Sequence, residues 1–179
     1  MVLVPDEQLA VGWISFVMFV GLLPGMINGR SRSGYAELEQ PSFAPPPWLF
    51  GIVWPVLYGL MGAAAYLVQI NGGFFVAGVN RTPLWLFLAL QAVLAAWSFV
   101  FDGKRGLGLS LLVVTAGFVL SIVVSVLFGD TELAVYLMLP TVLWLGFASL
   151  LAYYLYKLNK PRCKKPKKSK KRDKDAEAV

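Results

Sequence analysis

The chain has 179 residues, of which 58% are hydrophobic and 15% are charged, whereas soluble domains carry about a quarter charged residues. Residues 1–156 hold five basic and seven acidic side chains, and residues 157–179 hold eleven basic and three acidic ones. This pattern excludes an ordinary soluble domain, predicts a membrane protein with a basic tail, and argues against nucleic-acid binding by the body of the chain.

Five uncharged, apolar segments are long enough to cross the roughly 30 Å hydrocarbon core of a bilayer as helices. They cover residues 9–27, 48–70, 83–101, 107–128 and 133–158. The connections between them are short, which predicts that consecutive helices are antiparallel neighbours. We therefore expect an all-α membrane protein, a bundle of five transmembrane helices within residues 1–158, followed by a disordered basic tail over residues 159–179.

The distribution of lysine and arginine predicts the orientation of this bundle. If the C-terminus lies inside, that side holds the tail and four further basic residues, Arg30, Arg32, Lys104 and Arg105. The opposite side holds only Arg81. Because basic residues accumulate on the cytoplasmic side, we expect the N-terminus outside and the C-terminal tail in the cytoplasm, in a multi-pass protein whose particular membrane the residues do not specify.

Two rows of small residues recur at four-residue spacing, which lets helix backbones approach closely in lipid. They are Gly21, Gly25 and Gly29 in the first span and Gly117, Ser121 and Ser125 in the fourth. Packing within the bundle is the simpler interpretation, and homodimerisation and sterol contact are the alternatives.

The second span combines a rigid start with an aromatic face. Pro45, Pro46 and Pro47 lack amide donors, so they are expected to mark the beginning of a helix rather than to lie inside one. In the apolar run that follows, Trp54 and Tyr58 are four residues apart and share a helix face. This face is expected to form a wall for a flat apolar ligand.

Three tryptophans lie deeper in the predicted spans than the interfacial belt that usually holds this residue type. They are Trp54, Trp97 and Trp144, whereas Trp48 and Trp85 lie near span ends. A buried indole N–H needs a hydrogen-bond partner, and apolar ligand pockets are also lined by aromatic rings. On the residues alone, core packing and ligand contact are equally open for these three side chains.

The interiors of the predicted spans contain no aspartate, glutamate, lysine or arginine, and the chain has no histidine and one cysteine, Cys163. Ion-coupled carriers, acid–base enzymes and Cys/His metal sites need such groups, so none of these classes is expected. No motif requires a cofactor. Any chemistry would have to come from tryptophan or from the ligand itself.

Three segments resemble the motifs of a known family. Residues 41–62, PSFAPPPWLFGIVWPVLYGLMG, resemble its second helix, roughly KPxWxPPxWxxxxxWxxLYxxMG, and residues 139–153, LPTVLWLGFASLLAY, are similar to its PYLxWxxFAxxLNY. WSFVFDGKRG, from Trp97, resembles the end of its third helix. The family is that of the translocator proteins, also called tryptophan-rich sensory proteins or peripheral benzodiazepine receptors, and the likeness extends from about residue 15 to 159.

The resemblance implies a five-helix membrane protein, often dimeric, that binds porphyrins, sterols and synthetic aromatic ligands in one pocket. A loop between the first two helices would cover this pocket. Carried over position by position, the resemblance implies two pocket tryptophans, their neighbours, and residues of the mouth and lid: Trp54, Trp144, Tyr58, Phe147, Ala148, Trp97, Trp48, Pro45, Pro46, Phe43 and Tyr35.

The chain departs from the family pattern at several of these places. Phe43 stands where the family has tryptophan, and of a Trp-Tyr pair in the lid only Tyr35 is kept. The asparagine of the third helix has no counterpart, and Thr141 and Ala152 replace a tyrosine and an asparagine in the fifth. Fewer polar groups are therefore expected to face a bound ligand.

A cholesterol-recognition pattern, L/V-x₁₋₅-Y-x₁₋₅-K/R, is formed by Leu151, Tyr153 and Lys157. Many helix ends satisfy this pattern. An interfacial tyrosine followed by a lysine that extends to the headgroups is the simpler explanation.

We expect a membrane protein that binds porphyrin- or haem-like or sterol-like hydrophobic ligands and translocates or senses them. Its partners would be the lipid bilayer, the ligand and a second copy of the chain, with no nucleic acid. One alternative is an enzyme that degrades a porphyrin in a reaction dependent on light or oxygen. The other is a structural membrane protein without a small ligand.

Overall fold

The computed structural model describes residues 6–27, 34–72, 80–101 and 106–160. Five long helices dominate this part of the chain, with one short helical turn at residues 34–36: α1 (Asp6–Ile27), α3 (Pro47–Gly72), α4 (Thr82–Val100), α5 (Leu107–Leu127) and α6 (Glu132–Asn159). Each long helix has the length and apolar composition to cross a membrane. The predicted all-α fold with five spans is therefore confirmed, and every helix boundary falls within three residues of its predicted position.

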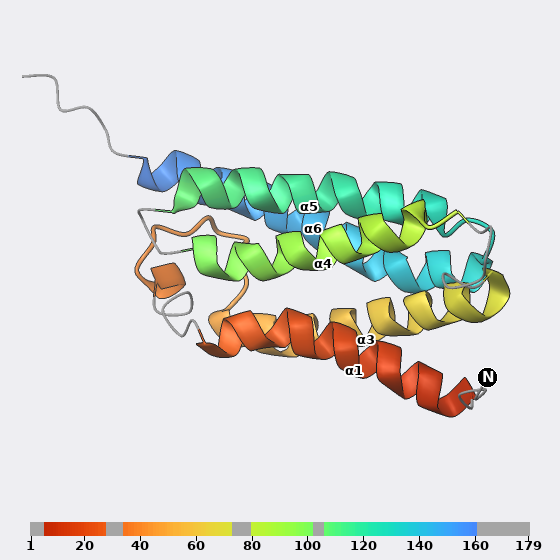
Figure 1. The fold of residues 1–179 in the computed structure, drawn as a ribbon. Helices are drawn as coiled ribbons and strands as arrows, with labels where there is room; N and C mark the ends of the chain where they lie inside the picture. Colours follow the sequence, from red (N-terminus) through yellow and green to blue (C-terminus); the bar gives the residue numbers. More distant parts are fainter. Residues whose placement is uncertain (1–5, 28–33, 73–79, 102–105, 161–179) are drawn as a thin grey trace, which may run out of the picture.

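The five helices pack as a closed ring in the order α1–α3–α6–α5–α4 (Figure 1). Close contacts join α1 to α3, α3 to α6, α6 to α5, α5 to α4, and α4 back to α1. The prediction that consecutive helices are neighbours is confirmed for three connections. It is wrong for α3 and α4, because α1 lies between them in the ring.

One half of the bundle has a solid core. Val17, Met61, Phe87 and Met138 are all fully buried there, and the rings of Phe87 and Phe128 lie 5.8 Å apart. In the other half α1 ends, α3 begins, α4 ends, α5 begins and α6 ends, and the residues on the inside leave a cavity. The bundle is therefore packed at one end and hollow at the other.

Gly21 of the first row and all three members of the second row serve packing inside the bundle, whereas Gly25 lines the cavity and a Cβ atom there would meet nothing within 4 Å. A Cβ atom on Gly21 would overlap the ring of Tyr58, and one on Gly117 would meet side chains of α4 at 3.5 Å. The other two members of the second row are buried on α5. Gly29 lies outside the described residues.

Gly62 marks the closest approach of α3 to α1. A Cβ atom at this position would lie 2.6 Å from the Cα atom of Ile14, a backbone atom that cannot rotate away. We expect Gly62→Ala to force the two helices apart and to lower the free energy of unfolding by about 2 kcal/mol. Denaturation of the purified protein, followed by circular dichroism, measures this change.

Gly59→Ala is the matched control, because a Cβ atom on Gly59, in the same helix, would meet nothing within 4 Å. It should be neutral or slightly stabilising, since alanine is the better helix former. Equal destabilisation by both variants would contradict the close α1–α3 contact.

The chain continues as helix one residue past the predicted limit of the transmembrane domain, because α6 includes Asn159. Residues 161–179 lie outside the described part, so the disorder of the tail stays a prediction. The orientation of the termini across the membrane also stays a prediction.

Candidate functional site

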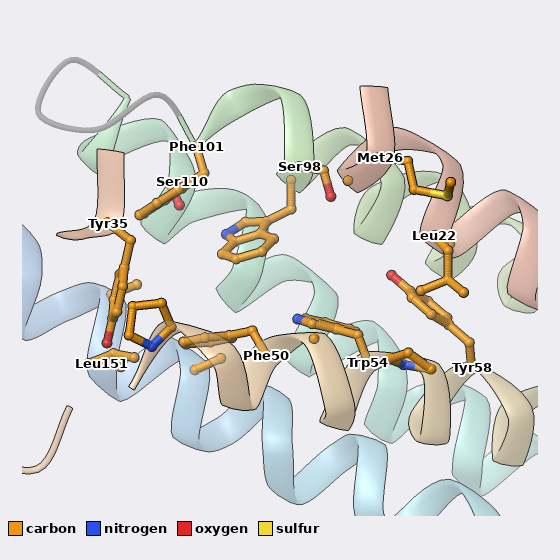
Figure 2. A pocket seen from close by; sticks show the side chains of 18 of the residues that line it. Leu22, Met26, Tyr35, Phe50, Trp54, Tyr58, Ser98, Phe101, Ser110 and Leu151 are labelled. Carbon is orange, nitrogen blue, oxygen red and sulfur yellow. The ribbon is translucent and has the colours of Figure 1, made fainter. Parts of the chain in front are cut away.

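A cavity of about 560 Å³ occupies the hollow half of the bundle (Figure 2). All five long helices contribute to its lining, and Tyr35 adds a side chain from the segment between α1 and α3. The volume lies within the ~300–1,000 Å³ range that is typical of small-molecule sites. Most of the exposed area of the lining is apolar.

Aromatic rings form a nearly continuous wall of this cavity. On α3 the rings of Trp54 and Tyr58 stack with centroids 5.4 Å apart and planes 25° apart. At the end of α4 the rings of Trp97 and the capping residue Phe101 stack in the same way, 5.5 Å and 28° apart. The two pairs meet where the indoles of Trp54 and Trp97 lie 6.0 Å apart.

Tyr35 and Phe50 extend the wall at the end where α3 begins. The ring of Tyr35 lies 6.4 Å from Phe101 and meets Phe50 edge-on at 5.3 Å. All six of these aromatic residues line the cavity. Figure 2 shows Tyr35 and Phe101 at one end of the cavity and Tyr58, with its hydroxyl towards Leu22 and Met26 of α1, at the other.

The hydroxyl of Tyr35 anchors the segment that covers this end. It donates a hydrogen bond to the carbonyl oxygen of Pro45 at 3.0 Å, and the side chain is only 6% exposed. Burial raises the pKa of this hydroxyl above its ordinary value, because the charged form would be desolvated. Tyr35 therefore stays protonated, and a donor, at neutral pH.

Two polar atoms of the lining have no hydrogen-bond partner among the described residues: Nε1 of Trp97 and Oγ of Ser110. Other serines behave differently. The hydroxyls of Ser121, Ser125 and Ser149 each donate to a carbonyl of the preceding turn. A buried polar group without a partner costs about 1–3 kcal/mol, so an acceptor on a bound molecule would be favourable at this wall.

The cavity brings together six of the residues predicted to bind a ligand or to form the sterol pattern. Those that line it are Trp54, Tyr58, Trp97, Ala148, Tyr35 and Leu151. Their presence in one lining does not test ligand binding, which stays a prediction for each of them.

Trp144 and Phe147 lie outside this lining. The ring of Trp144 packs 5.7 Å from Phe50, which separates it from the cavity, and 5.5 Å from Phe147. Its Nε1 atom is buried without a partner in the described chain. The structure thus places Trp97, rather than Trp144, against Trp54.

Apart from Tyr35, the residues expected at the mouth and lid also lie outside the lining. Pro45 is buried and accepts the hydrogen bond from the lid tyrosine, whereas Pro46 is exposed. Trp48 is 62% exposed, as expected for an interfacial tryptophan. Phe43 packs edge-on against Tyr154 at 5.4 Å.

The three residues of the sterol pattern do not share a surface. Leu151 is buried and lines the cavity, whereas Tyr153 and Lys157 are exposed on the outside of α6. This arrangement agrees with the simpler explanation, an outward tyrosine followed by an outward lysine.

Sequence reasoning missed several lining residues, and part of the signal was present. Phe50 precedes Trp54, and Phe101 follows Trp97, by four residues, which places each pair on one helix face. Gln91, which does not line the cavity, was also missed as a buried polar residue: it is 1% exposed in the middle of α4, with its amide nitrogen 3.7 Å from the sulfur of Met61. A lone amide in an apolar span was the available signal.

The lining of the cavity is almost free of ionisable groups. Apart from tyrosine, the lining holds no acidic or basic side chain. The described part of the chain also contains no group of three or more His, Cys, Asp or Glu residues that could hold a metal ion.

Both a family model and individual known proteins are similar to this chain over most of its length. Residues 13–158 match the model of the TspO/MBR family. The pig translocator protein is 34% identical over 164 residues, which cover 86% of this chain and 95% of the pig protein. A tryptophan-rich protein TspO of Archaeoglobus fulgidus is 31% identical over 150 residues (83% and 95%), and protein CrtK of Rhodobacter capsulatus is 31% identical over 129 residues (70% and 78%).

Proposed function

The chain belongs to the TspO/MBR family, and from this premise we propose that it binds a flat, conjugated, largely apolar molecule of the porphyrin class inside the membrane. The observation that carries the proposal is the wall of six contacting aromatic rings around a cavity of about 560 Å³. Planar ligands gain most from such walls, because each aromatic contact contributes about 0.5–1.5 kcal/mol beyond the burial of area.

The polar groups of the wall refine the class of ligand. Trp97 Nε1 and Ser110 Oγ are donors with no partner in the part of the chain that the structure describes, so a ligand with a carbonyl or carboxylate oxygen fits this wall better than a pure hydrocarbon. A sterol offers aliphatic rings to the aromatic faces and is the weaker candidate. Translocation, sensing and homodimerisation are further proposals that lie beyond this binding step.

Fluorescence titration tests the proposal. Protoporphyrin IX added to the purified protein in detergent should quench tryptophan fluorescence saturably, because Trp54 and Trp97 line the cavity. Empty micelles with an equal concentration of free tryptophan are the control for partitioning. Quenching that rises linearly and equals the control would contradict the proposal, and full competition by cholesterol would favour a sterol site.

A further inference from the structure

The last residue of α6 forms two hydrogen bonds with the segment that covers the cavity. The side-chain oxygen of Asn159 accepts from the backbone N–H of Glu39 at 2.9 Å, and its amide nitrogen donates to the carbonyl oxygen of the same residue at 2.9 Å. The amide nitrogen also donates to the carbonyl of Leu155 in its own helix at 3.0 Å. The amide is therefore oriented by α6 and pairs with Glu39 as a neighbouring strand would.

The bonded segment, residues 34–46, is braced internally. Gln40 donates from its side-chain amide to the carbonyl of Tyr35 at 2.9 Å, and Tyr35 in turn donates to Pro45 at 3.0 Å. Leu38, between these anchors, is only 5% exposed and belongs to a buried cluster with Leu151 of α6. Residues 34–46 are thus expected to move as one unit.

This segment lies at the end of the bundle where α6 ends (Figure 1). The remaining lining residues belong to the five long helices, whose backbones are held by their own hydrogen bonds, except Phe101, which caps the end of α4. Residues 34–46 are the part of the wall whose opening requires the least disruption of helix. The two bonds of Asn159 are solvent-exposed, so water competes for them and they can break without unfolding the bundle.

We propose that Asn159 is a latch that holds residues 34–46 over the cavity, and that release of its two bonds to Glu39 sets the rate of ligand exchange. The inference rests on the proposed function, because it assigns to the same cavity a residue that controls access to it. Asn159 is a positioning residue, since it does not line the cavity.

The opening of the segment is measured without any ligand. Glu37 and Glu39 are exposed, so a glutamate-specific protease can cut the segment when it opens. Asn159→Ala should speed this cleavage about tenfold, as expected for the loss of two solvent-exposed hydrogen bonds. Cleavage of the variant at the wild-type rate would overturn the latch.

Asn71 provides a matched control. Near the end of α3, its amide also donates to the carbonyl four residues earlier, at 2.9 Å from Leu67, and no bond from Asn71 to a covering segment is found in the described chain. Asn71→Ala should leave cleavage after Glu37 and Glu39 unchanged. Equal acceleration by both variants would show a general loss of stability and would overturn the inference.

Ligand exchange is then followed with protoporphyrin IX by stopped-flow fluorescence. Dissociation from Asn159→Ala should be about tenfold faster, with a smaller change in Kd, because a latch affects both entry and exit. Unchanged rates with intact binding would overturn the inference and leave the proposed function standing. Absence of binding to every variant would overturn the proposed function, whereas the cleavage assay would still report on the latch.

Discussion

Replacing Trp54 and Trp97 together with alanine is expected to weaken protoporphyrin binding at least about a hundredfold. The ring centroids of the two indoles lie 6.0 Å apart, and each indole continues a stack, Trp54 with Tyr58 on α3 and Trp97 with Phe101 at the end of α4. Their loss removes two aromatic contacts and the apolar area of both rings, together about 3 kcal/mol or more. The shift in the Soret absorbance of the porphyrin on titration gives Kd in variants that have lost tryptophan.

Two further variants make this result specific. Trp85, on the same helix as Trp97, is 63% exposed, so Trp85→Ala should leave Kd unchanged. Trp144→Ala should weaken binding by less than tenfold, because Trp144 reaches the cavity only through Phe50. If Trp144→Ala weakens binding as much as the double variant does, the ligand binds beside α6 and not in the cavity.

The spans could be predicted from sequence because the cost of burying charge in a bilayer marks helix ends sharply. Charged side chains closely flank four of the apolar segments, whereas the second, residues 48–70, is bounded by prolines before it and by Asn71 and Gly72 after it, and all helix boundaries fell within three residues of prediction. The order of the helices around the ring could not be predicted in the same way. Nothing in the sequence indicated that α1 separates α3 from α4, because that depends on which faces pack best.

The sequence predicted how deep the site residues lie in their spans, but only partly which helix face carries each of them. In a soluble helix the polar side identifies the outward face, whereas in a membrane every face is apolar and this signal is missing. The spacing of Trp54 and Tyr58 placed them on one face, and the structure shows both in the lining. Trp144 is equally deep in its span, but rotation about α6 turns it behind Phe50.

The roles of small polar residues were even harder to predict from the sequence than those of the tryptophans. Ser110 occurs in an apolar helix with several other serines, and only coordinates show that its hydroxyl, unlike those of Ser121 and Ser125, finds no carbonyl of its own helix. Asn159 looked like the first residue of a charged tail. Its role depends on Glu39, 120 positions earlier in the chain, which no local pattern reveals.

Filling the cavity is expected to abolish most of the binding while the bundle stays folded. Ala152 lines the cavity on α6 and retains only 8% exposure. In Ala152→Phe the new ring would occupy space that a ligand needs, so binding must displace it at a cost of about 1–3 kcal/mol. Affinity for protoporphyrin should therefore fall about tenfold to hundredfold, measured by the same absorbance titration.

Ala89→Phe is the control, because Ala89 is exposed on α4 and outside the lining. It adds the same ring to the outer surface, and both its Kd and its melting temperature should match those of the wild type. The melting temperature of Ala152→Phe separates occlusion from misfolding: a folded variant with weak binding places the ligand in the cavity. A folded Ala152→Phe that binds with wild-type affinity would show that the porphyrin binds elsewhere, since the ring and the ligand cannot share one space.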